Sequence, residues 1–167
     1  MKDFEKIMSD LRNKVFNPVY FLMGEEPYFI DKISDYIEKN VLDEAEKSFN
    51  QTVIYGLETD IESIINTAKR YPMMSEYQVV IVKEAQNIKN IDNLVYYLEA
   101  PLKSTILVIN YKYKKLDKRK KLYTSISRNA IVFESKKLYD NQIPDWISDY
   151  LKNTGLNIQP EATMLLS

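Results

Sequence analysis

Five short runs of apolar residues recur along the chain, and each is rich in β-branched or aromatic side chains. They occupy residues 19–23, 52–55, 79–82, 105–109 and 130–133. Each run is nearly continuous and does not alternate with polar residues, a pattern typical of parallel strands that are covered on both faces. The pattern therefore predicts five strands of a buried sheet.

Segments with helical periodicity separate these runs. Their apolar positions recur at intervals of three and four residues, which places them on one face of a helix. The stripes are Phe4, Ile7, Met8, Leu11 and Val15; Phe29, Ile33, Tyr36 and Ile37; Ile61, Ile64, Ile65 and Ala68; and Ile91, Leu94, Val95 and Leu98; a further helix is expected near 118–127. Thr59 and Glu62 have the spacing of a capping box. Strands that alternate with helices predict an α/β sandwich around a five-stranded parallel sheet.

The pattern changes after the fifth run. Residues 140–152 have one apolar face and carry Pro144 in the first turn, which predicts a helix with Trp146 in the core. Pro160 is expected to open another helix. One helix and the start of a second cannot enclose a core, so this part is expected to be the beginning of a second, all-helical domain.

The composition excludes most familiar catalytic sites. The 167 residues include no cysteine and no histidine, which excludes zinc and iron–sulfur sites built on those ligands, thiol nucleophiles and triads with a histidine base. The three glycines, Gly24, Gly56 and Gly155, lie too far apart for a complete GxxxxGK[ST] or GxGxxG loop. Acidic pairs such as Glu44 and Glu46 lack a second convergent group. We therefore expect no catalytic residue, no metal and no cofactor in this chain.

Charge and hydropathy limit the partners. The net charge is −1, from 23 basic and 24 acidic residues, so any contact with nucleic acid must come from a local patch. No segment approaches the ~20 apolar residues of a membrane span, and the first residues do not form a signal peptide. We therefore expect a cytoplasmic protein with no membrane partner.

Ligands of open α/β sheets bind beyond the carboxyl ends of the strands. The residues that follow the first strand are Gly24, Glu25, Glu26 and Pro27. The two carboxylates would repel a triphosphate, and proline lacks a backbone N–H. The third strand is followed by Lys83 and Glu84, where a nucleotide hydrolase would place acidic residues for magnesium, and a lysine cannot ligate a cation. Both positions predict ordinary strand-to-helix turns, with residual nucleotide binding as the alternative.

Four segments resemble the delta subunit of the bacterial DNA polymerase III clamp loader. They are FLMGEEPY at 21–28, PMMSE at 72–76 with VVIVK at 79–83, LDKRKKLY at 116–123, and the helix around Trp146 with LNIQPEA at 156–162. The resemblance extends over essentially the whole chain. It implies an AAA+-like three-layer sandwich at 1–138 with a degenerate nucleotide site, then the beginning of a small helical lid domain at 139–167, with the C-terminal collar domain absent.

The resemblance also implies a function. Delta subunits bind the ring-shaped sliding clamp (beta) and help to open it for loading onto primed DNA during DNA replication, and they do not hydrolyse ATP. The implied partners are the clamp, the delta-prime and tau/gamma subunits, and DNA, the last only weakly. We expect that this chain is not an enzyme, because a nucleotidyltransferase label would belong to the polymerase holoenzyme. We also expect the isolated chain to be monomeric. The alternatives are a divergent AAA+ nucleotide-dependent ATPase and a DNA-binding domain.

Two adjacent methionines stand out before the third strand. Met73 and Met74 lie off the apolar stripe of the preceding helix, and Pro72 interrupts that helix. The residues leave two interpretations open: the methionines protrude as a flexible apolar plug, or they cover the end of the sheet as core. By resemblance, Tyr71, Pro72, Met73 and Met74 occupy the clamp-binding position, where the family commonly has two bulky apolar residues.

One strongly positive segment, the basic run, follows the fourth predicted strand and leads into the helix expected near 118–127. It consists of Lys112, Lys114, Lys115, Lys118, Arg119, Lys120 and Lys121. It could contact DNA phosphates, with Tyr111 and Tyr113 adding stacking, or it could be a solvated loop whose lysine stems cover apolar surface. Ser127 and Arg128 precede the fifth strand at the place of the arginine finger of partner subunits, but Asn129 replaces the cysteine of that motif.

Overall fold

The computed structural model of the chain describes residues 2–156, 162 and 165. The chain divides into two compact units, Met1–Ser135 and Lys136–Ser167. The first unit contains α1 (Lys2–Arg12), β1 (Val19–Gly24), α2 (Pro27–Asn40), α3 (Glu44–Asn50), β2 (Gln51–Tyr55), α4 (Ile61–Ala68), β3 (Gln78–Lys83), the 3-10 turns η1 (Ala85–Asn87) and η2 (Ile91–Leu94), α5 (Val95–Leu98), β4 (Thr105–Lys112), α6 (Lys121–Asn129) and β5 (Ile131–Ser135). No described helix is both long enough and apolar enough to cross a membrane.

The strands of the first unit form one parallel sheet in the order β2-β3-β4-β1-β5. This arrangement confirms the predicted five-stranded parallel sheet. In the register, Phe21 of β1 lies between Ile109 of β4 and Val132 of β5. The three inner strands are buried along almost their whole length, because each has a neighbour on both sides and helices over both faces.

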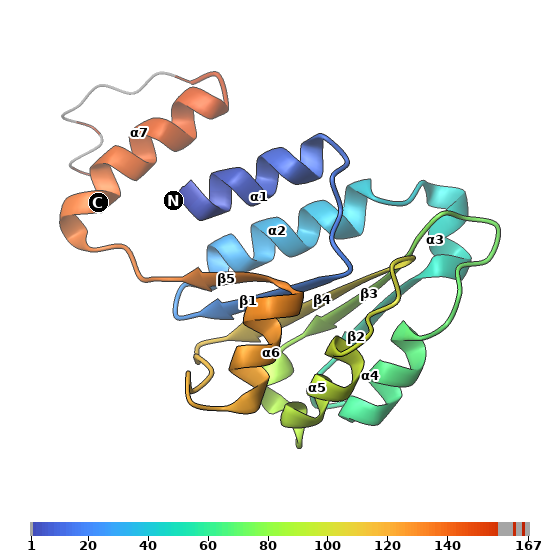
Figure 1. Ribbon diagram of the computed structural model, residues 1–167. Coiled ribbons are helices and arrows are strands. Elements are labelled where there is room, and N and C mark those ends of the chain that lie inside the picture. Colours follow the sequence, from blue (N-terminus) through green and yellow to red (C-terminus); the bar gives the residue numbers. More distant parts are fainter. Residues whose placement is uncertain (1, 157–161, 163–164, 166–167) are drawn as a thin grey trace. The chain divides into compact units, whose positions relative to one another are not determined.

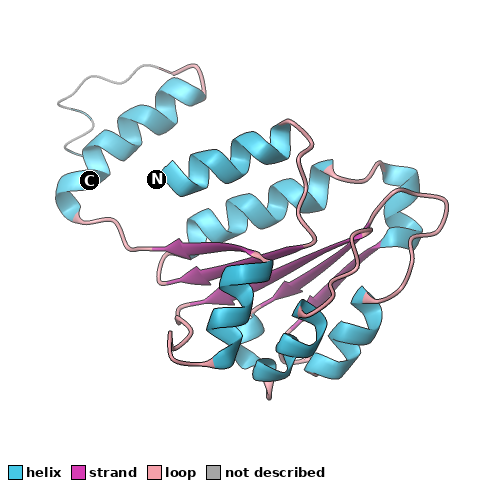
Figure 2. Cartoon of the chain, viewed as in Figure 1, coloured by secondary structure: helices cyan, strands magenta, loops and turns pink. Residues whose placement is uncertain are grey.

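Helices cover the two faces of the sheet. Figure 1 shows α1 and α2 on one face and α4, α5 and α6 on the other, and Figure 2 shows the same three layers by type of element. The apolar stripes predicted from the sequence supply the buried side chains on both faces. They include Ile7, Met8 and Leu11 of α1; Phe29, Ile30, Ile33 and Ile37 of α2; and Ile61, Ile64, Ile65 and Ala68 of α4. Val15, predicted to belong to the first stripe, lies beyond α1 and is exposed.

The prediction that every strand is covered on both faces is wrong for β2. Thr52, Val53 and Tyr55 are exposed, and Gln51 and Ile54 are half-buried. β2 is an edge strand, paired with β3 alone. A continuous apolar run predicts a strand but does not give its place in the sheet, and an edge position leaves part of the run in contact with water.

The cap of α4 also differs from the prediction. Asp60, and not Thr59, accepts a hydrogen bond from the backbone N–H of Ser63 (2.8 Å). Hydrogen bonds from the backbone and side chain of Ser63 hold the pKa of the Asp60 carboxyl below its usual range, because they stabilise the charged form. The cap therefore stabilises the fold above the ordinary pKa of an aspartate, and this contribution is lost as the pH falls through the lowered pKa.

The second unit is helical in its described part. It contains the 3-10 turn η3 (Asp140–Gln142) and α7 (Ile143–Asn153), which has Pro144 near its start as predicted. Trp146 stacks on Tyr150 with ring centroids 5.5 Å apart, but it is only partly buried, so its assignment to the core is wrong. No described side chain of α7 is fully buried. The helix predicted at Pro160 lies outside the described residues, and a lid domain at 139–167 stays a prediction.

Candidate functional site

The segment between α4 and β3 lies at the amino end of the parallel sheet. α4 ends at Ala68, before Pro72, and β3 begins at Gln78. The buried side-chain Nε2 of Gln78 lies 3.1 Å from the carbonyl oxygen of Thr67 and 3.2 Å from that of Ala68. These contacts satisfy carbonyl groups that a helix end leaves without an intrahelical partner. The start of β3 therefore fixes the end of α4, and the intervening loop leaves the sheet from a rigid base.

Large apolar side chains of this loop are in contact with water. Tyr71 is 76% exposed, Met73 is 62% exposed and Met74 is fully exposed. The interpretation that the two methionines cover the sheet as core is therefore wrong. Met74 has a φ of 54°, a left-handed conformation that is uncommon for a residue with a side chain. A backbone of this kind persists only where its surroundings hold it.

A buried asparagine from α3 holds the loop. Asn50, the last residue of α3, is 5% exposed. Its Oδ1 accepts a hydrogen bond from the Met73 N–H (2.6 Å), and its Nδ2 donates to the Met73 carbonyl (2.9 Å). Phe49, next to it in sequence, is 73% exposed. We call Phe49, Tyr71, Met73 and Met74 the apolar tip.

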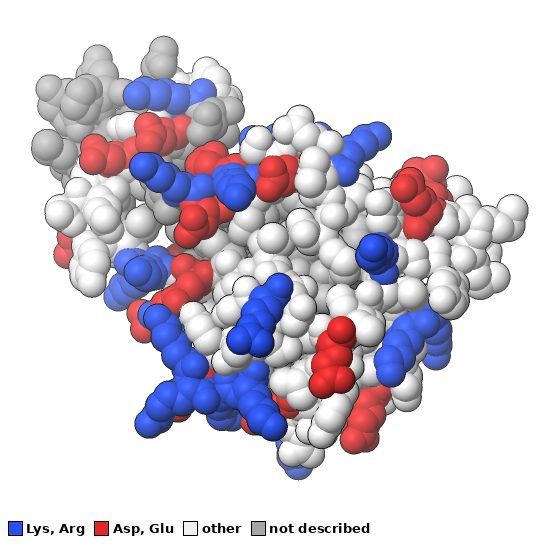
Figure 3. Space-filling model, viewed as in Figure 1, with Lys and Arg blue, Asp and Glu red and all other residues white. Residues whose placement is uncertain are grey.

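The figures show where the apolar tip lies. In Figure 1 the loop after α4 runs beside α3, at the end of the sheet where β2 and β3 begin. In Figure 3 the surface over these two segments is mostly uncharged, with both acidic and basic side chains at its border. Exposed apolar groups gathered beside one another, with polar groups around them, are typical of a protein interaction surface.

The loop after β1 lies at the opposite end of the sheet, where a nucleotide would bind. The backbone N–H groups of Gly24, Glu25 and Tyr28 already have acceptors within the protein, and Pro27 has no N–H. The bonds run from Gly24 N to the Lys114 carbonyl (3.2 Å), from Glu25 N to the Ser135 carbonyl (3.1 Å) and from Tyr28 N to Glu26 Oε1 (3.1 Å). A phosphate-binding loop needs these donors free to face the phosphates. The geometry therefore does not form a phosphate cradle.

The position expected to hold magnesium contains an ion pair. Lys83 Nζ lies 3.0 Å from Glu38 Oε2 of α2. Burial lowers the pKa of Lys83, but the hydrogen bond and the charge of Glu38 together raise it above its usual value. Glu84 follows with a φ of 54° and makes no side-chain cap. Among the described residues, no group of three or more acidic side chains could hold a metal ion.

Carboxylates neutralise much of the basic run: three come from other elements, and Asp117 lies within the run itself. The ion pairs are Lys112 with Asp31 (2.6 Å), Lys115 with Glu134 (3.0 Å), Arg119 with Asp117 (2.7 Å) and Lys120 with Asp92 (2.8 Å). Figure 3 shows basic side chains gathered at the lower left, beside α6. Tyr111 packs against Phe21, with ring centroids 5.9 Å apart, so it is not free to stack on a base, whereas Tyr113 is exposed.

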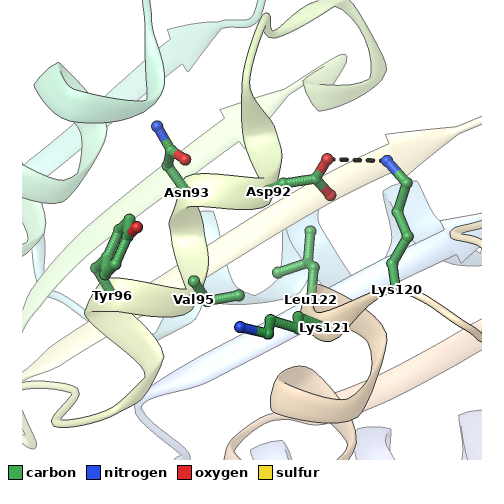
Figure 4. A pocket seen from close by; sticks show the side chains of 7 residues that line it. All are labelled: Asp92, Asn93, Val95, Tyr96, Lys120, Lys121 and Leu122. Atoms are coloured by element: carbon green, nitrogen blue, oxygen red, sulfur yellow. Dashed lines mark hydrogen bonds and ion pairs between the residues drawn. The ribbon is translucent and has the colours of Figure 1, made fainter.

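A shallow pocket lies between η2, α5 and α6. Its volume is about 290 Å³, and its lining consists of Asp92, Asn93, Val95, Tyr96, Lys120, Lys121 and Leu122. Figure 4 shows the ion pair between Lys120 and Asp92 at its edge. The only carboxylate in the lining is occupied by this pair, so the pocket offers no acid–base pair for catalysis.

Sequence comparison decides the family. A family model described as "DNA polymerase III, delta subunit" matches residues 20–136. The chain belongs to the DNA polymerase III delta subunit family. A curated relative, DNA polymerase III subunit delta of Bacillus subtilis, is 30% identical over 166 residues, which cover 93% of this chain and 48% of the relative. The chain thus spans about half the length of this delta subunit. The resemblance found in the sequence is confirmed.

Solved structures extend the comparison to the fold. The Bacillus subtilis DNA clamp loader delta protein aligns with a TM-score of 0.81 and 28% identity, covering 98% of this chain and 51% of that one. A DNA polymerase III gamma-subunit-related protein and RuvB, both from Thermotoga maritima, align with TM-scores of 0.51 at 15% and 13% identity; each alignment covers 98% of this chain, and 58% and 55% of the respective relatives. The AAA+-like sandwich predicted for a delta chain is confirmed.

Two minor candidates from the sequence lie at helix ends. Glu46 forms a capping box with Asp43 at the start of α3, and Glu44 pairs with Lys47 at 2.6 Å. Arg128 lies exposed in the last turn of α6. Glu44 and Glu46 thus support the start of α3, as expected for acidic residues in a first turn.

Sequence reasoning missed Asn50 and Phe49. Asn50 lies 23 residues before Met73, and a contact over that distance leaves no local pattern in the sequence. The signal that was present is a polar residue at a junction where α3 passes into β2 without a connecting loop. A side chain at such a junction is held on both sides by regular structure.

Proposed function

We propose that this delta-family chain binds a ring-shaped sliding clamp through Tyr71, Pro72, Met73 and Met74 and helps to open it for loading onto primed DNA. The observation that carries the proposal is the exposure of two adjacent methionines whose backbone a buried asparagine fixes. Methionine is flexible and polarisable, so its side chain adapts to an apolar pocket. A backbone that is already ordered loses less conformational entropy on binding.

The proposed function does not include ATP hydrolysis by this chain. The occupied N–H groups of the loop after β1 support this, and so does the ion pair of Lys83 with Glu38 at the magnesium position. A divergent AAA+ ATPase would need both positions for the nucleotide and its metal ion. The delta-prime and tau/gamma subunits of the clamp loader are the further proposed partners, and the family assignment supports them.

The test is a calorimetric titration of the full chain with the sliding clamp of the same organism. We expect saturable binding that is insensitive to ATP, because the contact is apolar and lies at the end of the sheet away from the loop after β1. A chain that shows no heat of binding and does not comigrate with the clamp in gel filtration would overturn the proposal. Binding that requires ATP would favour the ATPase alternative.

DNA binding through the basic run is the second candidate, and the structure limits its strength. Lys114, Lys118 and Lys121 are the members of the run without a carboxylate partner in the described structure. Three phosphate contacts predict a slope of about −2.7 for the logarithm of affinity against the logarithm of salt concentration, whereas all seven cations would give about −6. Fluorescence anisotropy with duplex DNA at several salt concentrations measures the slope. A slope near −6 with tight binding would show that the ion pairs open on DNA.

A further inference from the structure

Asn50 joins two parts of the chain at the base of the apolar tip. Its side chain makes two hydrogen bonds to the backbone of Met73: Oδ1 accepts from the N–H (2.6 Å), and Nδ2 donates to the carbonyl (2.9 Å). It is also the point where α3 passes directly into β2. The backbone that carries Asn50 is therefore held on one side by a helix and on the other by a strand of the sheet.

The other end of α3 is fixed as well. Asp43 and Glu46 form a reciprocal capping box, with the Glu46 N–H donating to Asp43 Oδ1 (2.9 Å) and the Asp43 N–H donating to Glu46 Oε2 (3.0 Å). Such a box satisfies backbone donors that a helix start leaves unpaired. α3 is thus a short helix fixed at both ends, and it presents the Asn50 amide from a rigid support.

Away from Met73, the described hydrogen bonds of the loop lie toward its two ends, at Arg70 and at Ser75. Pro72 cannot donate a backbone hydrogen bond, and Met74 has a left-handed φ of 54°. The side chain of Met74 is fully exposed and that of Met73 is 62% exposed, so the two contribute little packing that would hold this backbone. Without the Asn50 amide, the N–H and carbonyl of Met73 would bond to water, and the loop would lose the contacts that fix its direction.

We propose that Asn50 is a positioning residue for clamp binding. It holds the backbone of Met73 so that the two methionines point outward together, in the conformation that the clamp pocket accepts. The proposal rests on the proposed function of the same loop and adds to it a residue outside that loop. A site residue whose support is itself locked loses less entropy when its partner binds.

The experiment compares two buried asparagines of the full chain. Asn50→Ala removes both bonds to Met73. Asn110→Ala is the matched control, because Asn110 is fully buried on β4 and its Nδ2 donates to Ser34 Oγ (2.9 Å), away from the loop. For each variant, calorimetry gives the affinity for the clamp, amide hydrogen exchange gives the protection of the Met73 N–H, and thermal unfolding gives the stability.

We expect Asn50→Ala to bind the clamp about tenfold more weakly, equal to about 1.4 kcal/mol. The Met73 amide should also exchange faster, because its acceptor is gone. Asn110→Ala should lower the melting temperature and leave clamp affinity within about twofold of the unchanged chain, as expected for an independent site. Asn50→Asp serves as a second variant of the same size: its carboxylate faces the Met73 carbonyl without a donor, so it should also bind more weakly.

The outcomes separate the two proposals. A folded Asn50→Ala or Asn50→Asp chain with unchanged clamp affinity would overturn the role of Asn50, even if the methionines prove essential. Equal losses of affinity in Asn50→Ala and Asn110→Ala would also overturn it, because the effect would then be general destabilisation. If alanine at both methionines leaves the affinity unchanged, the proposed function fails as well.

Discussion

Replacing Met73 and Met74 together by alanine is expected to weaken clamp binding at least about 100-fold. Burying two methionine side chains contributes on the order of 3–6 kcal/mol, and about 2.7 kcal/mol corresponds to this factor. The fold should be unaffected, because Met73 is 62% exposed and Met74 is fully exposed, and surface substitutions usually change the free energy of unfolding by less than about 0.5 kcal/mol. Calorimetry against the clamp and thermal unfolding of the chain measure the two quantities.

A second double variant controls for the loss of exposed apolar surface in general. Leu57 and Tyr96 are both exposed, and Leu57 follows β2 at the carboxyl end of the sheet, away from the apolar tip. Leu57→Ala with Tyr96→Ala should leave clamp affinity unchanged. If both double variants weaken binding to the same extent, or if the methionine variant unfolds more easily by a comparable free energy, the assignment of the clamp contact to Met73 and Met74 is wrong.

Gly24→Ala is expected to destabilise the first unit by about 3 kcal/mol or more, since backbone strain and overpacking each cost about 1–3 kcal/mol. Gly24 has a φ of 133°, and a Cβ placed there would lie 2.0 Å from the carbonyl oxygen of Ser135. Gly24 pairs with Lys112 of β4 and Ser135 of β5, so neither strand can move away without breaking the sheet. The melting temperature should fall by about 6–12 °C.

Gly56→Ala is the comparison for this substitution. A Cβ on Gly56 would lie 2.3 Å from the Glu84 carbonyl, but Gly56 does not have the left-handed φ of Gly24. Its contact is with a turn beyond β3 and not with a paired strand. The destabilisation should therefore be smaller. Thermal unfolding of both variants tests this, and equal losses would mean that the positive φ and the strand pairing of Gly24 add nothing to the steric contact.

The sheet could be predicted because its inner strands are apolar on both faces. Runs such as 79–82 and 106–109 have no polar position at which the pattern could be mistaken for an alternating strand. The order of the strands is a long-range property, however, so the exposure of Val53 and Tyr55 at the edge was not predictable from their own segment. At the start of α4, Thr59 and Asp60 are adjacent residues that both favour caps, and sequence alone does not separate them.

The candidate site also combines features that the sequence indicated with features that only the fold shows. Local features left open whether Met73 and Met74 protrude or cover the sheet: Pro72 ends the helical pattern just before them, and only the family resemblance favoured the outward position. The contact with Asn50 depends on two distant segments meeting. The basic run was visible as a cluster of lysines, but most of the carboxylates that pair with it belong to other elements, among them Asp31 of α2 and Glu134 of β5. Sequence patterns show which charges are close along the chain, and only the fold shows which are neutralised.

The parallel sheet separates the apolar tip from the loop after β1. The apolar tip lies where β2 and β3 begin, and the loop after β1 lies where the strands end. β3 has six residues, which makes it about 20 Å long. The sheet is therefore a stiff spacer between the apolar tip and the loop after β1, so a protein bound at the apolar tip would leave the other end of the sheet accessible.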